Sequence, residues 1–140
     1  MLRHTRMSPS RAPVLAALAA VAGLQACADG ATGGGACTAM FASVPVTVID
    51  GAGQPVEAAT VTAVLVRTGQ TLVPTGLILT TPGTYPLVDD GSTSVIQRSG
   101  EAVQAHISKG AQSLSVDYVF AVPDGCHVSK VSGPDTVALQ

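Results

Sequence analysis

The sequence predicts an all-β domain, a sandwich of two packed sheets, behind an N-terminal export signal. From Thr38 onward apolar and polar residues alternate with a period of two, and β-branched residues are frequent. Turn signals built from glycine, proline and aspartate recur about every ten residues, and no long helical pattern interrupts them. Several short strands at such a spacing are typical of an all-β sandwich. A short apolar run near the N-terminus indicates export.

This N-terminal segment has the layout of a secretory signal peptide. Arg3, Arg6 and Arg11 give it a basic start, and the eleven residues from Val14 to Leu24 are all Val, Leu, Ala or Gly. A helix that crosses the hydrocarbon core needs about 20 apolar residues, whereas the apolar region of a signal peptide needs about 7 to 15. We therefore expect residues 1–26 to be a signal peptide with a helical apolar run.

The residues at the end of this run resemble the lipobox of bacterial lipoproteins. That motif has a leucine three positions before the cysteine and a small residue just before it, and here these are Leu24 and Ala26. The resemblance implies cleavage before Cys27 and lipid attachment to Cys27. Ala28, rather than aspartate, follows, which by resemblance to sorting rules in Gram-negative bacteria implies the outer membrane, on its periplasmic side. The alternative is an ordinary signal peptide cut at another small residue, which leaves Cys27 as a free thiol.

Cleavage at this position divides the chain into three parts. Residues 1–26 are the signal peptide, residues 27–37 are the lipidated cysteine and a glycine-rich tether, and residues 38–140 are the β-sandwich domain. By the random-coil estimate the tether spans about 15 to 18 Å, so it holds the domain close to the membrane. Its three consecutive glycines are not followed by Lys-Ser or Lys-Thr, so a phosphate-binding loop is not indicated.

The mature chain is acidic. Removal of the signal peptide leaves four cations against all nine acids of the chain, a net charge of about −5, and the cations are Arg67, Arg98, Lys109 and Lys130. So few cations do not neutralise a run of phosphates, and the chain has no tryptophan to stack on bases, so we expect no nucleic-acid partner. A basic patch for anionic lipid is missing as well, which leaves the lipid anchor as the link to the membrane.

With Cys27 lipidated, the two remaining cysteines form an even pair in an oxidising compartment, where disulfides persist. We predict a disulfide between Cys37 and Cys126. It closes a loop of about 90 residues, for which the chain-entropy model gives up to about 4 to 5 kcal/mol of stabilisation.

The first predicted strand carries Val44, Val46 and Val48 on one face, as a half-buried strand requires. Pro45 has no N–H to donate, so this strand is expected at a sheet edge or with a bulge. Two further well-patterned strands, Ala102–Ser108 and Ser113–Val122, lie later in the domain, and each has three or four apolar residues on one face. The predicted strands are Ser43–Asp50, Ala58–Arg67, Thr71–Val73, Leu77–Thr80, Tyr85–Val88, Ser94–Gln97, Ala102–Ser108, Ser113–Val122 and a last one from Cys126, interrupted around Gly133-Pro134 and resumed from Thr136 to Leu139.

The run VTVIDGAGQPVEAATVTA, Val46–Ala63, resembles the opening hairpin of the carboxypeptidase regulatory-like family, whose members begin V-x-V-x-D-x-x-G-x-P-V-x-G-A-x-V. The matching residues are Asp50, Gly53, Pro55, Val56, Ala59 and Val61. The C-terminal run DGCHVSKVSGPDTVAL is similar to the last strand of small bacterial lipoproteins of this type. The resemblance implies a seven-stranded Greek-key β-sandwich of the transthyretin or immunoglobulin kind, and it implies little about activity because such folds host many activities.

Each candidate for chemistry has a structural competitor. Cys126 and His127 are adjacent and therefore point to opposite faces of a strand, which favours a disulfide plus an exposed histidine over a thiolate pair. His106 is out of phase with its apolar neighbours and is expected to face solvent. A zinc site needs three or four ligands at close spacing, so we expect no metal site. Asp89-Asp90-Gly91 is expected to be a turn rather than a calcium loop.

These observations predict a lipid-anchored structural or protein-binding module of the bacterial cell envelope. We expect no catalytic residues and no cofactor. Enzymes that hydrolyse hydroxyisourate share the transthyretin-like architecture, but they end in Tyr-Arg-Gly-Ser, whereas this chain ends in Val-Ala-Leu-Gln. Its partner is the membrane, through the lipid, and an envelope protein. The alternative is a carrier of a small ligand or metal, built from loops at one end of the sandwich, with His106, His127 and the Asp89-Asp90 turn as contributors.

Overall fold

The computed structural model describes residues 37–76 and 79–140, which belong to one compact unit. The predicted signal helix, the lipid site at Cys27 and most of the tether lie outside the described residues. Within them, no helix is long and apolar enough to cross a membrane. The strands are β1 (Ser43–Ile49), β2 (Thr60–Leu65), β3 (Thr71–Leu72), β4 (Thr84–Asp89), β5 (Glu101–Lys109), β6 (Gln112–Ala121), β7 (Ser129–Ser132) and β8 (Thr136–Ala138), with a short 3-10 helix η1 (Asp90–Ser92) after β4.

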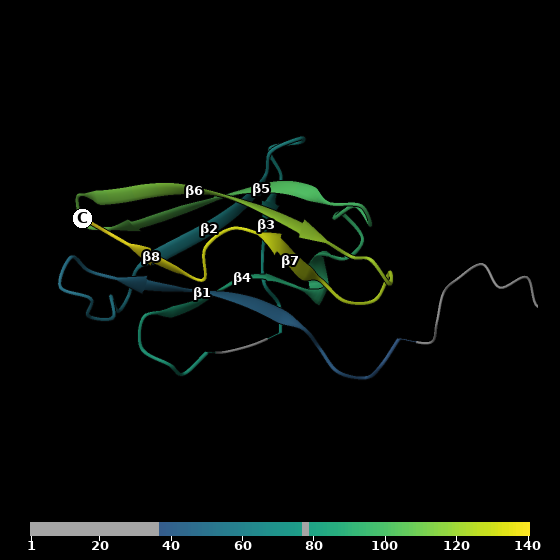
Figure 1. The fold of residues 1–140 in the computed structure, drawn as a ribbon, viewed down its shortest axis with the longest axis horizontal. Helices are drawn as coiled ribbons and strands as arrows, with labels where there is room; N and C mark the ends of the chain where they lie inside the picture. The colour runs from purple at the N-terminus through teal and green to yellow at the C-terminus, as the bar shows by residue number, and fades with distance from the viewer. Residues whose placement is uncertain (1–36, 77–78) are drawn as a thin grey trace, which may run out of the picture. The chain divides into compact units, whose positions relative to one another are not determined.

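The strands form two sheets, so the predicted all-β sandwich is confirmed (Figure 1). One sheet has the order β4-β1-β8, in which β8 runs parallel to β1. The other has the order β3-β2-β5-β6-β7 and is antiparallel throughout. In Figure 1, β5 and β6 run through the upper layer, and β1 and β4 run through the lower one.

The core lies between the two sheets and is built from the alternating residues. Val46 and Val48 of β1 face the apolar side chains of the other sheet, where Val103, Ala105 and Ile107 of β5 are buried as predicted. On β6, Tyr118 and Phe120 stack with ring centroids 5.8 Å apart and are buried. Because side chains two residues apart share a face of a strand, the period of two places all of them inside.

Proline in β1 has the predicted effect. The register of β1 against β4 shifts between Val44 and Pro45, which is a bulge. The other neighbour, β8, pairs only with Thr47–Ile49, so Pro45 lies beyond the end of that ladder. The strand is central in its sheet, yet the residue without an N–H faces no β8 partner.

Three expectations are wrong. Ser94–Gln97 forms turns rather than a strand, because the carbonyl of Ser92 accepts from the N–H groups of Val95 and Ile96. The last strand does not begin at Cys126, since the Asp124 carboxylate accepts the N–H groups of both Cys126 and His127 and holds them in a turn. The described residues form eight strands rather than seven. The predicted break around Gly133 separates β7 from β8, and these two strands join different sheets.

The opening segment Val46–Ala63 forms only a short hairpin, closed by an isolated antiparallel bridge between Ile49 and Pro55, and not one in which β1 pairs with β2. Its turn is present, with the Asp50 carboxylate accepting the N–H groups of Ala52 and Gln54, each at 2.8 Å. However, β1 and β2 belong to different sheets, so the segment crosses from one layer to the other. Of the predicted strand Leu77–Thr80, the first two residues lie outside the described part and the last two are not in a strand.

Candidate functional site at the disulfide end

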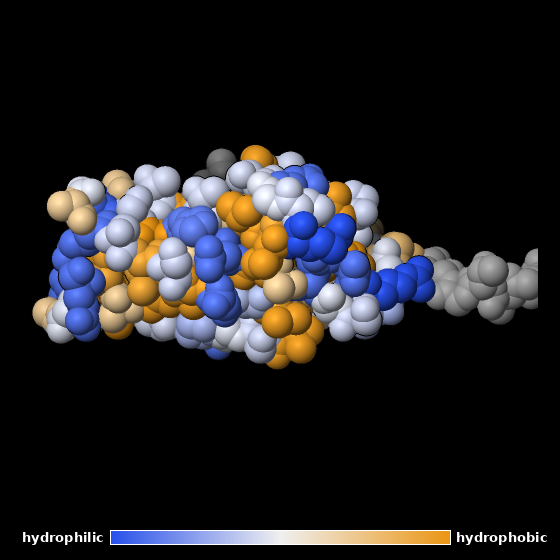
Figure 2. All heavy atoms as spheres, turned by 90° about the horizontal axis from the view of Figure 1, so that it is seen from above, coloured by the Kyte–Doolittle hydropathy of each residue, from blue (hydrophilic) through white to orange (hydrophobic). Residues whose placement is uncertain are grey.

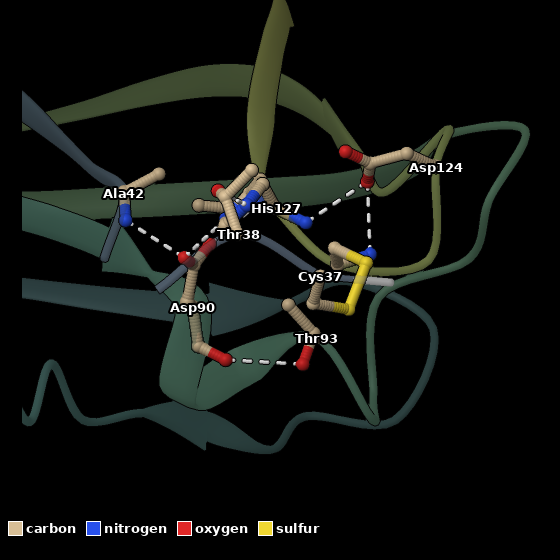
Figure 3. The surroundings of a disulfide bond; sticks show 9 residues. Cys37, Thr38, Ala42, Asp90, Thr93, Asp124 and His127 are labelled. Atoms are coloured by element: carbon tan, nitrogen blue, oxygen red, sulfur yellow. Dashed lines mark hydrogen bonds and ion pairs between the residues drawn. A yellow bond between two sulfur atoms is a disulfide. The ribbon is translucent and has the colours of Figure 1, made fainter. Parts of the chain in front are cut away.

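The predicted disulfide is present and ties the start of the domain to the loop between β6 and β7. The Cα atoms of Cys37 and Cys126 are 5.4 Å apart, a usual separation for a disulfide. In sequence the two cysteines are 89 residues apart. Figure 3 shows this bond beside a group of polar side chains from η1, from the segment before β1 and from the β6–β7 loop.

Asp90 is the centre of that group. Its Oδ2 atom accepts the N–H of Ala42 at 2.7 Å, and its Oδ1 atom accepts the N–H of Val128 at 2.8 Å. The Nδ1 atom of His127 lies 2.8 Å from Oδ2. Burial by itself raises the pKa of Asp90, but these hydrogen bonds outweigh it and hold the pKa below its usual value. A single carboxylate thus joins three separate segments of the chain.

His127 connects Asp90 to the N-terminal end of the domain. Its Nε2 atom lies 2.8 Å from the Oγ1 atom of Thr38, so the residues that follow the two cysteines contact each other just as the cysteines do. The imidazole is 25% exposed, which corrects the expectation of an exposed histidine. The physical reason is that the turn at Asp124 directs the ring inward, toward Asp90.

The order hydroxyl, imidazole, carboxylate is that of a nucleophile triad. The hollow beside it, however, has a volume of about 90 Å³ and is lined by Thr38, Met40, Phe41, Ala42 and His127. Pockets that bind small molecules measure about 300 to 1,000 Å³. Both oxygens of Asp90 also accept backbone N–H groups, so a structural role accounts for the arrangement in full. These bonds hold the segment before β1 against the rest of the sandwich.

Asp89, the neighbouring aspartate, is fully buried and holds a different loop. Its Oδ2 atom accepts the N–H groups of Thr75 at 2.5 Å and Gly76 at 3.0 Å, and its Oδ1 atom accepts that of Gly91 at 3.0 Å. A Cβ atom on Gly76 would overlap the ring of Phe41, so the ring lies directly against this glycine. Asp89 therefore positions the backbone on which Phe41 packs.

The residues named for a ligand or metal carrier are not gathered into one site. The structure brings Asp90 and His127 together, whereas His106 lies on the exposed face of β5, with its Nδ1 atom 2.9 Å from the Oγ atom of Ser115. Within residues 37–76 and 79–140 no three His, Cys, Asp or Glu residues are placed to hold a metal ion. A second hollow of about 300 Å³ lies between β3 and η1 and is lined by Thr71, Val73, Ser92 and Val95 among others.

From the sequence, Asp89 and Asp90 were expected to form a turn and, in the alternative function, to contribute to a ligand site; their role in holding loops together was not predicted. A usable signal was present, since an aspartate that ends a buried strand just before a glycine is a natural cap for a short helix. Asp89 is the N-cap of η1, and Asp90 occupies its first position. Their long-range roles depend on which loops lie beside η1, and the local sequence does not contain that information.

The depressed pKa values predict a loss of stability in acid. Hydrogen bonds from the N–H groups of His127 and Cys126 lower the pKa of Asp124. The hydrogen bonds to Asp90 likewise lower the pKa of Asp90. A carboxyl group with a lowered folded pKa stabilises the fold above the unfolded value of about 3.9, and the contribution disappears as the pH falls through the folded pKa. Urea midpoints are therefore expected to be flat down to about pH 5 and to decrease below about pH 4.

The double variant Asp90→Asn and Asp124→Asn is expected to have a shallower acid slope than the wild type. Asp117→Asn, on the exposed face of β6, is the matched control and keeps the wild-type slope. Equal slopes for the double variant and the wild type between pH 5 and pH 3 would contradict the assignment.

No protein-family model, curated protein or solved structure matches this chain.

Proposed function

We propose that this chain is a bacterial lipoprotein whose carboxypeptidase regulatory-like domain, a transthyretin-like Greek-key sandwich, acts as a structural or protein-binding module rather than as an enzyme. It is anchored through a lipid on Cys27 to the outer membrane and faces the periplasm. The observation that carries the proposal is the disulfide between Cys37 and Cys126. Disulfides persist in exported proteins, and this pairing leaves Cys27, three positions after the end of the apolar run, as the odd cysteine.

The edges of the two sheets limit how a protein partner is bound. Three of the four edge strands are short: β3 has two residues, β8 has three and β7 has four. The fourth, β4, contains Pro86, which donates no hydrogen bond. Short edges and edge prolines oppose the addition of a partner strand, so a partner is recognised by side chains.

The outer face of the five-stranded sheet mixes polar and apolar side chains and offers weak anchoring (Figure 2). Gln104 donates to Asp117 at 3.0 Å across β5 and β6, next to the pair formed by His106 and Ser115. Figure 2, which looks down on the upper layer of Figure 1, shows hydrophilic and hydrophobic residues interspersed over this surface. A protein partner is therefore not expected to bind mainly on this face.

Labelling with palmitate tests the anchor. The wild-type chain, expressed in a Gram-negative host, is expected to incorporate labelled palmitate and to fractionate with the outer membrane. Cys27→Ser is expected to incorporate none and to leave that fraction. Ala31→Ser is the matched control, because it makes a similar small substitution four positions after Cys27 and keeps both the lipobox and the two disulfide cysteines. Label in Cys27→Ser, or none in the wild type, would contradict the proposal.

A second candidate function, a carrier of a small ligand, is favoured by one observation: the hollow between β3 and η1 has the volume of a small ligand pocket, at the lower end of the range. Calorimetric titration with a panel of divalent metals and small polar solutes separates the two functions. The proposed module binds nothing tighter than about 1 mM, which is roughly −4 kcal/mol. A tighter complex that is lost when Ser92 is replaced by a bulky residue favours the carrier.

A further inference from the structure

We propose that Met40 and Phe41, the apolar tip, contact the lipid surface to which the chain is anchored. This inference rests on the proposed lipid at Cys27. The partner is the interfacial layer of a bilayer, into which apolar side chains insert by about 5 to 10 Å.

Both side chains of the apolar tip are exposed to solvent. Met40 is 78% exposed and Phe41 is 50% exposed, and they are consecutive in sequence. The other large aromatic side chains of the domain are half-buried or buried: Tyr85, Tyr118 and Phe120. Two large apolar side chains side by side in water are unfavourable, whereas the same pair is favourable at a lipid interface.

The backbone of the tip is held in place by the fold. The ring of Phe41 lies against Gly76, whose N–H is bound by the buried carboxylate of Asp89. The next residue along the chain, Ala42, donates its N–H to Asp90. The exposed side chains are therefore presented by an ordered backbone, so their exposure is a property of the fold.

The tip lies close in sequence to the proposed anchor. Met40 follows Cys37 by three residues, and the disulfide fixes Cys37 to the same end of the sandwich. Between the proposed lipid site and Cys37 there are nine residues, with a span of about 15 to 18 Å by the random-coil estimate. The tip thus lies on the part of the domain from which the tether to the bilayer starts.

The charged groups near the tip are partly balanced. The mature chain is acidic, but the carboxylates near the tip are engaged: Asp89 and Asp90 are buried or nearly so and accept backbone N–H groups, and Asp124 accepts two more. The guanidinium group of Arg98 lies beside Gly125 in the same loop region, where a Cβ atom would be 2.7 Å from its Nη2 atom. The hydrogen bonds leave these carboxylates charged, and the Arg98 cation in the same loop region offsets part of that charge at the headgroup layer.

A single tryptophan tests the proposal, since the chain contains none. Phe41→Trp in the full lipidated protein is reconstituted in phosphatidylcholine vesicles with or without brominated acyl chains. The fluorescence is expected to shift to the blue and to be quenched severalfold more strongly than that of Ala52→Trp, the matched control in the exposed turn that follows β1. Met40→Trp is a second reporter at a site too exposed to disturb folding, and it should behave like Phe41→Trp.

Quenching at positions 40 and 41 no stronger than at position 52, in protein that floats with the vesicles and carries palmitate, overturns the apolar tip and leaves the anchor intact. Protein that carries no palmitate overturns the anchor and the tip together. The two failures are therefore distinguishable in one set of samples.

Discussion

Replacing both Cys37 and Cys126 with serine is expected to lower the free energy of unfolding by about 4 to 5 kcal/mol. The disulfide joins residues 89 apart, and the chain-entropy model gives this value for a loop of about 90 residues. Small domains have about 5 to 15 kcal/mol of stability in total, so the loss leaves the fold marginal. Equilibrium urea unfolding of the two purified proteins measures the difference.

Reductant provides the control for this prediction. The reduced wild type is expected to unfold at the midpoint of the double variant, and the double variant is expected to be insensitive to reductant. A double variant within about 1 kcal/mol of the oxidised wild type would show that the bond contributes little, which is known for strained disulfides.

The variant Asp89→Ala is expected to lower the free energy of unfolding by about 2 to 4 kcal/mol. Three backbone N–H groups lose their acceptor, and each unsatisfied donor costs about 1 to 3 kcal/mol, less where water reaches it. Thr75 and Gly76 lie at the surface, so the expected loss is below the full sum. Chemical denaturation measures it, and near-ultraviolet circular dichroism reports whether the ring of Phe41 changes its surroundings.

Asp117→Ala is the matched control for Asp89→Ala. Asp117 is exposed on β6 and accepts one hydrogen bond from Gln104, so its removal should change stability by less than about 0.5 kcal/mol. Asp89→Asn keeps one acceptor oxygen and is expected to lie between the two. Equal denaturation midpoints for Asp89→Ala and Asp117→Ala would contradict the structural role assigned to Asp89.

The parts of the fold that local pattern decides were predictable. Strands β1, β2, β5 and β6 follow from the alternation of apolar residues, because burial of one face imposes a period of two. The pairing of Cys37 with Cys126 follows from cysteine count once Cys27 is assigned to the lipid. His106 was correctly expected to be exposed, because it is out of phase with Ala105 and Ile107.

The parts of the fold that long-range contacts decide were not predictable from the sequence. Ser94–Gln97 contains β-branched residues, but it forms a turn because two of its N–H groups donate to the carbonyl of Ser92. The assignment of β1 and β2 to different sheets depends on packing and not on the turn at Asp50. The contact between Thr38 and His127 becomes predictable only after the disulfide is known, since it joins the residues that follow the two cysteines. Asp90 and His127 were named together only for the alternative carrier, and the bonds from Ala42 and Val128 to Asp90 were not predicted because these residues lie far from it in sequence.

The central claim, a lipid-anchored module closed by one disulfide, is tested most directly by mass spectrometry of the protein extracted from the envelope and alkylated without reductant. The account predicts a mature chain that begins at Cys27 and carries the mass of attached acyl chains, with no alkyl group on Cys37 or Cys126. A chain that begins at another residue without added lipid mass, or that carries alkyl groups on both of these cysteines, would contradict it.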